Sequence, residues 1–284
     1  MFEMLLVLAA AAAAAGLLSA LGYLLAWGVL HGRRDGPGWE KLTGCRYAHR
    51  GLHGPGAPEN SLAAFRRAAE AGYGAELDVH LTRDGRLAVI HDGDLQRMCG
   101  VSGRVEEKTA AELSALRLGD TGERVPFLEE VLPLFAGRAP LIVELKTDWR
   151  SAAELARRTV ECLDRFSIDY CVESFDPRPL RWLRRHRPSV LRGQLSQNFH
   201  RHPSGQVPWN RLALTNLFYN AFTRPDFVAY RFGDREKPAV RLCRKFGMRM
   251  AYWTLRSRAD VALAEQEGAL PIFEEPDRPK EVTH

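Results

Sequence analysis

The sequence predicts an α/β protein: a (β/α)₈ TIM barrel with a small β-hairpin insertion, preceded by one N-terminal transmembrane helix. Apolar strand-like runs alternate with helical patterns from Cys45 to near the end of the chain. One further strand-like run follows its predecessor too closely for a helix to intervene, and the chain begins with a long uncharged stretch. The expected bounds are 1–31 for the anchor, 32–44 for a linker and 45–284 for the barrel.

The N-terminal stretch Leu5–Leu30 contains no charged residue and is almost wholly apolar. As a helix it would run roughly 39 Å at about 1.5 Å per residue, which is enough to span a bilayer with some tilt. A cleaved signal peptide is the competing interpretation. The segment lacks a basic n-region, since Glu3 is the only early charge, and its apolar run is longer than a typical h-region. We therefore expect an uncleaved, single-pass membrane anchor.

Basic residues flank this stretch only on its C-terminal side. Arg33, Arg34, Lys41 and Arg46 follow it, and no lysine or arginine precedes it. The positive-inside rule then places the large domain in the cytoplasm. Gly32–Gly38 holds three glycines and a proline, which is typical of a short linker.

The composition is that of a globular domain without a nucleic-acid partner. Apolar residues make up 45% and charged residues 26% of the 284 residues. The net charge of +5, from 40 basic and 35 acidic residues, is spread along the chain and suits phosphate ligands or an anionic membrane only weakly. Five scattered cysteines with no CxxC pair argue against a disulfide framework or a structural zinc site. The oligomeric state stays open.

Eight strand-like runs are expected to form the barrel. They are Cys45–His49, Ala75–Val79, Leu141–Lys146, Tyr170–Ser174, Val190–Leu195, Phe227–Arg231, Arg249–Thr254 and Pro271–Phe273. Helical patterns lie between many of them, as at Ser61–Ala71, Ser151–Phe166 and Asp234–Phe246. The carboxyl ends of such strands line the active face of a parallel barrel, so polar residues at those ends are candidate site residues.

The extra run, Leu87–His91, is predicted to be the second strand of a hairpin. Thr82–Gly85 between it and the preceding strand has turn chemistry. A hairpin would bring His91 back beside Asp78, so that one short segment supplies carboxylates and an imidazole to the same place.

Three carboxylates lie on or near strand ends. Glu76 and Asp78 are two residues apart, and on a strand such residues point the same way. Glu144 would add a third oxygen ligand from another strand. An all-oxygen set suits one divalent ion, Mg²⁺ or Ca²⁺, better than Zn²⁺. The alternative is that these acids only pair with basic residues, Glu144 with Lys146 for example.

Two of the nine histidines differ from the others because they end apolar runs. His49 follows Cys45–Ala48 and stands before Arg50, whose guanidinium can bind phosphate oxygens bidentately. His91 follows Leu87–Ile90. Imidazoles move protons, so carboxylates, cations and two imidazoles together are the inventory for metal-assisted cleavage of a phosphate ester.

At this point the sequence resembles a known family, the glycerophosphodiester phosphodiesterases. The matching stretches are Ala48–Gly51, Pro58–Ser61, Glu76–Val79, Thr82–Gly85, Val89–Asp92, Val125–Leu132, Val143–Lys146, Ser174–Phe175 and Tyr252–Thr254. The resemblance implies a TIM barrel that hydrolyses glycerophosphodiesters to sn-glycerol 3-phosphate and an alcohol. It also implies His49 and His91 as the acid/base pair, and Glu76, Asp78 and Glu144 as the metal ligands.

Further residues are implied around the phosphate. Arg50 and Lys146 would contact it, with Glu59 and Asn60 in support. Asn60 is also expected to cap the helix that begins at Ser61, and a buried partner of an arginine is an equal interpretation of Glu59. The candidate substrate-pocket residues are Ser174, Phe175 and Trp253.

The resemblance has departures. Family members often end the last strand with a threonine–aspartate pair before a proline, whereas this chain has Glu274 and Glu275 before Pro276. The stretch from Gln194 to Asn220 does not map clearly. Its aromatic residues could line a mouth for an acyl chain or serve only as packing.

Three functions stay open within this resemblance. The leading one is hydrolysis of small glycerophosphodiesters. A lysophospholipase D acting on lysolipid phosphodiesters and a non-catalytic barrel that binds glycerophosphodiesters are the alternatives.

Overall fold

Eight parallel strands close into a barrel in the computed structural model, which describes residues 2–148, 151–203 and 208–274. Around the barrel the order is β1-β9-β8-β7-β6-β5-β4-β2, and β1 closes the ring because it pairs with both β9 and β2. The strands are β1 (Tyr47–His49), β2 (Gly74–Leu81), β4 (Leu141–Leu145), β5 (Tyr170–Ser174), β6 (Arg192–Ser196), β7 (Phe227–Arg231), β8 (Arg249–Leu255) and β9 (Leu270–Phe273). The predicted TIM barrel is confirmed.

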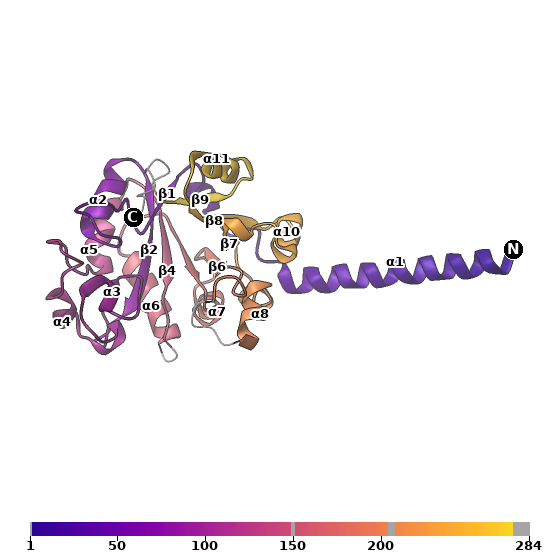
Figure 1. The fold of residues 1–284 in the computed structure, drawn as a ribbon, viewed down its shortest axis with the longest axis horizontal. Coiled ribbons are helices and arrows are strands. Elements are labelled where there is room, and N and C mark those ends of the chain that lie inside the picture. Colours follow the sequence, from indigo (N-terminus) through magenta and orange to yellow (C-terminus); the bar gives the residue numbers. More distant parts are fainter. Residues whose placement is uncertain (1, 149–150, 204–207, 275–284) are drawn as a thin grey trace, which may run out of the picture.

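Helices surround this ring, as Figure 1 shows. The main ones are α2 (Leu62–Glu70), α5 (Leu128–Phe135), α6 (Ala152–Leu163), α7 (Pro177–His186), α8 (Pro208–Thr215), α9 (Asn220–Thr223), α10 (Pro238–Lys245) and α11 (Arg258–Gln266). The core lies between strands and helices. Leu77 and Val79 of β2, for example, share one buried apolar cluster with Phe65 of α2 and Phe135 of α5.

One predicted helix begins later than expected. The pattern placed a start at Asp234, but Phe232–Asp234 forms a 3₁₀ turn and α10 begins at Pro238. A proline fits the first turn of a helix because the amide it lacks has no partner there in any case.

The predicted hairpin is present. β3 (Leu87–Val89) pairs antiparallel with β2, and the Ile90 amide donates to the Asp78 carbonyl at 3.1 Å. The chain then runs through α3 (Gln96–Cys99), the 3₁₀ turn Val105–Glu107 and α4 (Ala110–Ser114) before α5. This excursion has its own small apolar core, and it holds His91 over the barrel.

The N-terminal helix α1 (Phe2–Leu30) projects away from the barrel on the side of α10 (Figure 1). Its segment Ala10–Leu30 has a mean hydropathy of 1.8 and is long and apolar enough to cross a membrane. An N-terminal signal sequence has the same properties.

The segment after α1, predicted to be a linker, packs against the barrel. The Arg33 amide donates to the Pro225 carbonyl at 2.8 Å, and the Arg33 Nε lies 2.5 Å from the fully buried carboxylate of Asp226. Trp39 lies in a 3₁₀ turn, and its ring packs against that of Phe227 in a tilted arrangement with the ring centroids 5.4 Å apart. These contacts lie beside the amino ends of β6, β7 and β8, because Asp226 directly precedes β7.

Candidate active site

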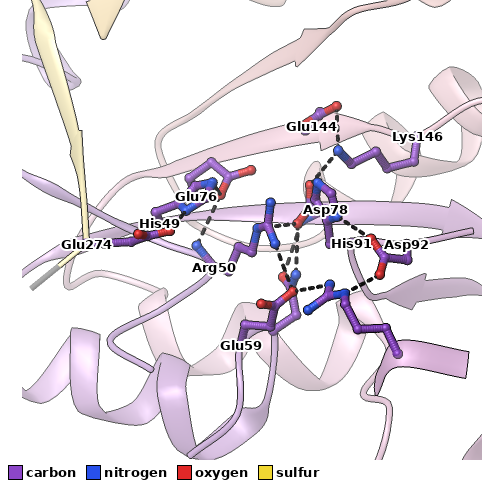
Figure 2. Close-up of polar contacts among 12 residues, drawn as sticks. His49, Arg50, Glu59, Glu76, Asp78, His91, Asp92, Glu144, Lys146 and Glu274 are labelled. Carbon is purple, nitrogen blue, oxygen red and sulfur yellow. Dashed lines mark hydrogen bonds and ion pairs between the residues drawn. The ribbon is translucent and has the colours of Figure 1, made fainter. Parts of the chain in front are cut away.

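Strand register brings the candidate residues to one end of the barrel. His49 of β1 lies opposite Glu76 of β2, and Asp78 of β2 lies opposite Glu144 of β4. Glu144 in turn lies opposite Glu173 of β5. Side chains alternate between the two faces of a strand, so Glu76 and Asp78, which are two residues apart, lie on the same face of β2. Both carboxylates therefore point into the barrel mouth. Figure 2 shows these side chains gathered from β1, β2 and β4.

Glu76, Asp78 and Glu144 form an acidic trio. One oxygen from each lies within 4.8 Å of the others, and their exposed fractions are 3%, 1% and 6%. Burial and the charge of Asp78 raise the pKa of Glu76 well above its usual value. Burial also raises the pKa of Glu144 to about 7, although Lys146 opposes the shift. Burial disfavours ionised Asp78 too, but nearby positive charges, that of Lys146 first, hold its pKa well below the usual range.

This trio fits a hard divalent cation. All of its donors are oxygen, and Asp78 Oδ1 is a buried oxygen that has an ion-pair partner in Lys146 but no hydrogen bond. Three buried carboxylates this close repel one another unless a positive charge lies among them. The predicted ligand set is therefore brought together.

Lys146 already neutralises part of that charge. Its Nζ lies 3.1 Å from Asp78 Oδ1 and 2.8 Å from Glu144 Oε1. The residue follows β4, and its amide donates to the Val79 carbonyl at 3.0 Å, which fixes the backbone beside β2. Burial works against the charged amine, yet the two carboxylates raise the pKa of Lys146 above its usual value. The ion pair between Lys146 and Glu144, which was the alternative to metal binding in the sequence analysis, thus forms within the predicted site.

Arg50 follows β1 in an unusual conformation. Its φ of 55° lies in the left-handed region, and its amide donates to Glu76 Oε2 at 3.1 Å. The guanidinium lies with Nη1 2.8 Å from Glu59 Oε1 and Nε 3.6 Å from Asp78 Oδ2. Left-handed backbone is costly for a residue with a side chain, so the surrounding contacts hold it in place. Glu59 therefore pairs with an arginine, which was the second of the two interpretations of this residue.

Asn60 does not cap the following helix, so that prediction is wrong. Ser61 does so: its hydroxyl accepts from the Ala64 amide at 3.1 Å. Asn60, at a φ of 56°, donates instead from Nδ2 to Asp78 Oδ2 at 2.8 Å. The amide therefore fixes the orientation of a metal-ligand candidate.

His49 is held by the end of the last strand. Its Nδ1 lies 2.8 Å from Glu274 Oε1, and its Nε2 lies 3.9 Å from Glu76 Oε2. Burial lowers the pKa of His49, although the bond to Glu274 opposes this shift. Arg256 bonds the other oxygen of Glu274 at 2.6 Å and steadies that carboxylate. Glu274, one of the two glutamates that stand before Pro276 in place of the family's usual pair, thus holds His49, whereas Glu275 lies outside the described residues.

His91 is held in the same way from the hairpin excursion. Its Nδ1 lies 2.7 Å from Asp92 Oδ1. Arg97 ion-pairs with Asp92 and also with Glu59, at 2.7 Å. Burial and then the charge of Lys146 lower the pKa of His91 to about 4. In both histidines a carboxylate at Nδ1 leaves Nε2 as the nitrogen that can exchange a proton.

Both histidines line one cavity of about 280 Å³ together with Glu76 and Glu144. Phe175 and Trp253 form part of its wall, with ring centroids 5.8 Å apart. A second cavity of about 610 Å³ shares His91, Glu144 and Phe175 with the first. The two cavities therefore adjoin.

Ser174, the third candidate pocket residue, borders only the larger cavity of these two. Its buried hydroxyl donates to the Leu145 carbonyl at 2.8 Å and accepts from the Asp176 amide at 3.1 Å. These bonds tie β5 to β4, so Ser174 supports the wall.

Sequence reasoning missed Glu173 and His80. Glu173 is 1% exposed, borders the smaller cavity and has Oε2 without a hydrogen-bond partner. Burial raises its pKa well above the usual value. A glutamate inside the apolar run Tyr170–Ser174 was the available signal, because such residues are rarely buried without a role. His80 bonds Glu106 through Nδ1 at 2.8 Å and the His91 carbonyl through Nε2 at 3.2 Å, so it supports the hairpin.

Three clustered carboxylates beside two imidazoles, an arginine and a lysine are the side chains that one class of enzyme uses, the metal-assisted phosphodiester hydrolases. The chain belongs to the glycerophosphoryl diester phosphodiesterase family, whose model matches residues 49–278. A glycerophosphodiester phosphodiesterase from Caldanaerobacter subterraneus subsp. tengcongensis is 30% identical over 225 residues, which cover 75% of this chain and 86% of that protein. The predicted family and class of enzyme are confirmed.

Two other similarities are found. A phosphodiesterase from Oleispira antarctica, solved in complex with the product sn-glycerol-3-phosphate, shares the fold with a TM-score of 0.67 at 22% identity, and the match covers 81% of this chain and 92% of that one. A lysophospholipase D from Rattus norvegicus is 30% identical over 133 residues, 42% of this chain and 40% of that protein.

Proposed function

We propose that this protein hydrolyses glycerophosphodiesters to sn-glycerol 3-phosphate and an alcohol, with His49 and His91 as the proton carriers. The observation that carries the proposal is the arrangement of the two imidazoles. Each has Nδ1 on a carboxylate and borders the cavity that Glu76 and Glu144 of the acidic trio also border. Neutral imidazoles with an accessible Nε2 are the groups that general acid/base catalysis requires.

Glu76, Asp78 and Glu144 are proposed to hold one divalent cation, Mg²⁺ or Ca²⁺. When bound, it supplies charge that stabilises the phosphoryl oxygens during displacement. Arg50 and Lys146 lie on either side of Asp78 and would take the remaining phosphoryl oxygens. The Arg50 guanidinium would turn from Asp78 toward the phosphate, while its Nη1 keeps the bond to Glu59 Oε1.

One imidazole would accept the proton of the nucleophile, which is either the neighbouring glycerol hydroxyl or a water. As the new oxygen–phosphorus bond forms, the bond to the alcohol oxygen breaks, and the other imidazole, in its protonated form, gives its proton to that oxygen. Both pKa values are lowered in the free protein, so the negative charge of a bound phosphodiester is needed to protonate the acid. Attack by the hydroxyl would give a cyclic phosphate, which water then opens with the two roles exchanged.

A lysophospholipase D activity is the second candidate. The cavity of about 610 Å³ that adjoins the site offers Phe175, Leu214 and Tyr219 to an acyl chain, although most of the side chains that line it are charged or polar. A barrel that binds without cleaving is disfavoured because both imidazoles and the acidic trio are in place.

The long apolar helix α1 is proposed to be a single-pass anchor, with the barrel on the cytoplasmic side. Its length and its C-terminal flank of basic residues support this orientation.

A substrate panel tests the proposed function. The full chain, in detergent or nanodiscs, is assayed with glycerophosphocholine and with lysophosphatidylcholine, in the presence of Mg²⁺, Ca²⁺ or a chelator. We expect metal-dependent release of choline from glycerophosphocholine and none from an Asp78→Asn variant. Equal turnover by that variant, or turnover that survives the chelator, would rule out the proposed site. Binding without turnover by the wild-type chain would favour the non-catalytic barrel.

A further inference from the structure

Three large apolar side chains are exposed in the segment that follows β6. Leu212 of α8 is 54% exposed, Phe218 is 46% exposed and Phe222 of α9 is 56% exposed. The Phe218 amide donates to the Ala213 carbonyl at 2.9 Å, so the chain folds back and the three side chains come from one compact segment, residues 210–223. A soluble surface rarely groups side chains of this size without a partner.

The same segment contacts the end of α1. Asn220 of α9 donates from Nδ2 to the Leu30 carbonyl at 3.0 Å, and Arg224 donates to the His31 carbonyl at 3.0 Å. Leu30 itself is 4% exposed. The end of α1 is therefore tied to α9 by buried and partly buried hydrogen bonds.

Aromatic residues of α1 mark where the free part of the helix begins. Tyr23 packs edge-on against Phe246 beside α10, with ring centroids 5.2 Å apart, and Trp27 stacks on His31 at 4.0 Å. Tyrosine and tryptophan favour the boundary between lipid and water. From Phe2 to Tyr23 the helix is roughly 30 Å long at about 1.5 Å per residue, which matches the hydrocarbon thickness of a bilayer. The membrane surface would then lie at the flank of the barrel that carries α9 and α10.

Positive charge surrounds this flank. Arg184 of α7 donates to the Phe222 carbonyl at 2.7 Å, and Arg224 lies near enough that the charge of Arg184, together with burial, lowers its pKa. Among the described residues, Arg184 bonds a backbone carbonyl and Arg224 bonds His31, and no ion pair with a carboxylate involves either of them. Their charge is thus available to lipid phosphates, which favours a bilayer rather than another protein as the partner.

The inner side of this segment borders the site. Asn210, Leu214 and Tyr219 line the cavity of about 610 Å³ that shares His91 and Phe175 with the catalytic cavity. One short segment thus exposes apolar side chains on its outer side and borders the entrance to the site on its inner side.

We propose that residues 210–223 rest on the bilayer that holds α1, with Leu212, Phe218 and Phe222 inserted at the level of the lipid headgroups. The entrance to the site then opens at the membrane surface and receives single-chain phosphodiester lipids directly from the bilayer. This inference rests on the proposed phosphodiesterase function and on α1 as an anchor, and it gives lysophospholipids, the second substrate class proposed above, a route into the site from the bilayer.

Lipid contact is tested first, without any activity measurement. The full chain is placed in nanodiscs of phosphatidylcholine and phosphatidylserine that contain a phospholipid with a photoactivatable group near the headgroup, and cross-linked peptides are identified by mass spectrometry. We expect cross-links in α1 and in the peptide that contains Leu212, Phe218 and Phe222. Cross-links confined to α1 would overturn the proposal.

Activity at the membrane is tested with a triple variant, Leu212→Ser, Phe218→Ser and Phe222→Ser, in the same nanodiscs. We expect kcat/KM for lysophosphatidylcholine embedded in the disc to fall about ten-fold, because insertion of apolar side chains contributes to lipid engagement. Turnover of water-soluble glycerophosphocholine should stay unchanged. The matched control is Val101→Ser, which alters an exposed apolar side chain, 37% exposed, in the hairpin excursion.

The outcomes separate the two proposals. Unchanged turnover of the embedded lipid by the triple variant would overturn the membrane-facing surface while the phosphodiesterase stands. No turnover of either substrate by the wild-type chain would instead overturn the proposed function.

Discussion

His49 and Glu274 meet where the barrel closes, since β1 pairs with β9 and the His49 Nδ1 lies 2.8 Å from Glu274 Oε1. The contact fixes the Glu274 carboxylate on the imidazole of His49. It holds the pKa of Glu274 at about 2: burial opposes ionisation, but the bond to His49 and the charge of Arg256 prevail. An ionised carboxylate at Nδ1 keeps the proton there and leaves Nε2 free.

The Glu274→Gln variant should lower kcat about 10- to 100-fold, the usual effect of removing a partner that orients a catalytic histidine. An amide can donate to Nδ1 and would favour the opposite tautomer. The affinity for metal should not change, since Glu274 lies outside the acidic trio. Steady-state kinetics with a pH profile check this, and Glu267→Gln, which alters a glutamate bonded to Tyr252 at 2.8 Å, is the control. A kcat equal to that of the wild-type protein would show that Glu274 does not position His49.

Replacing either imidazole should remove most turnover. His49→Ala and His91→Ala are each expected to lower kcat by about 10²- to 10⁴-fold, the range attributed to positioned proton transfer. Metal affinity, measured by calorimetry, should stay nearly intact in both. His186→Ala, on the exposed end of α7, serves as the control. Near-normal turnover in one variant would exclude that histidine from the acid/base pair.

Metal binding should strengthen as pH rises. The pKa of Glu144, about 7 in the folded protein, lies above its usual value, so this group favours folding below pH 4.5 and loses that contribution as pH rises through about 7 without metal. A cation must displace the same proton. We therefore expect the increase in Tm caused by Mg²⁺ or Ca²⁺, relative to a chelator, to grow from pH 5.5 to pH 8.

The Glu144→Gln variant provides the matched comparison for this pH series. With no proton to displace at that position, the pH dependence should weaken, and the part that remains belongs to Glu76, whose pKa burial and the charge of Asp78 also raise. A metal-induced increase in Tm that is constant with pH in the wild-type protein would contradict the assignment of Glu144 as a ligand.

Lys146→Met should separate the structural and substrate roles of the lysine. In a chelator the change leaves Asp78 and Glu144 without their shared cation, which costs about 3 kcal/mol of stability for a broken buried pair. Added metal should restore much of the Tm, whereas KM for the phosphodiester should stay raised. Lys245→Met, an exposed lysine, is the control. Full recovery of KM together with Tm would mean that Lys146 does not contact the phosphate.

The barrel and most of the site could be predicted because both depend on local patterns. Apolar runs mark the strands. Because Glu76 and Asp78 are two residues apart on one strand, their side chains point in the same direction. Partners from distant segments leave no such pattern. The contacts of Asn60 with Asp78 and of His80 with Glu106 depend on how loops fold over the barrel, so the sequence placed Asn60 near the phosphate and at a helix cap without indicating its bond to Asp78.

The glycines after α1 show the same limit. A glycine required for flexibility and one required for close packing look alike in a sequence. At Gly32 an added Cβ would lie 2.0 Å from the Pro225 carbonyl oxygen, so this glycine permits a close approach of two backbones. The sequence favoured a linker, whereas the structure shows a segment fitted against the barrel.

The Gly36→Ala variant should therefore destabilise the protein by about 2 kcal/mol, the usual cost of overpacking a filled site. A Cβ there would lie 2.0 Å from Asp226 Oδ1. That carboxylate has little freedom to move, because its other oxygen accepts from the Arg192 amide at 3.0 Å. Gly233→Ala is the matched control: a Cβ at Gly233 would have no atom within 4 Å, and its effect should stay within about 0.5 kcal/mol. Thermal unfolding of the full chain in detergent measures both, and equal Tm values for the two variants would show that residues 32–44 behave as a free linker.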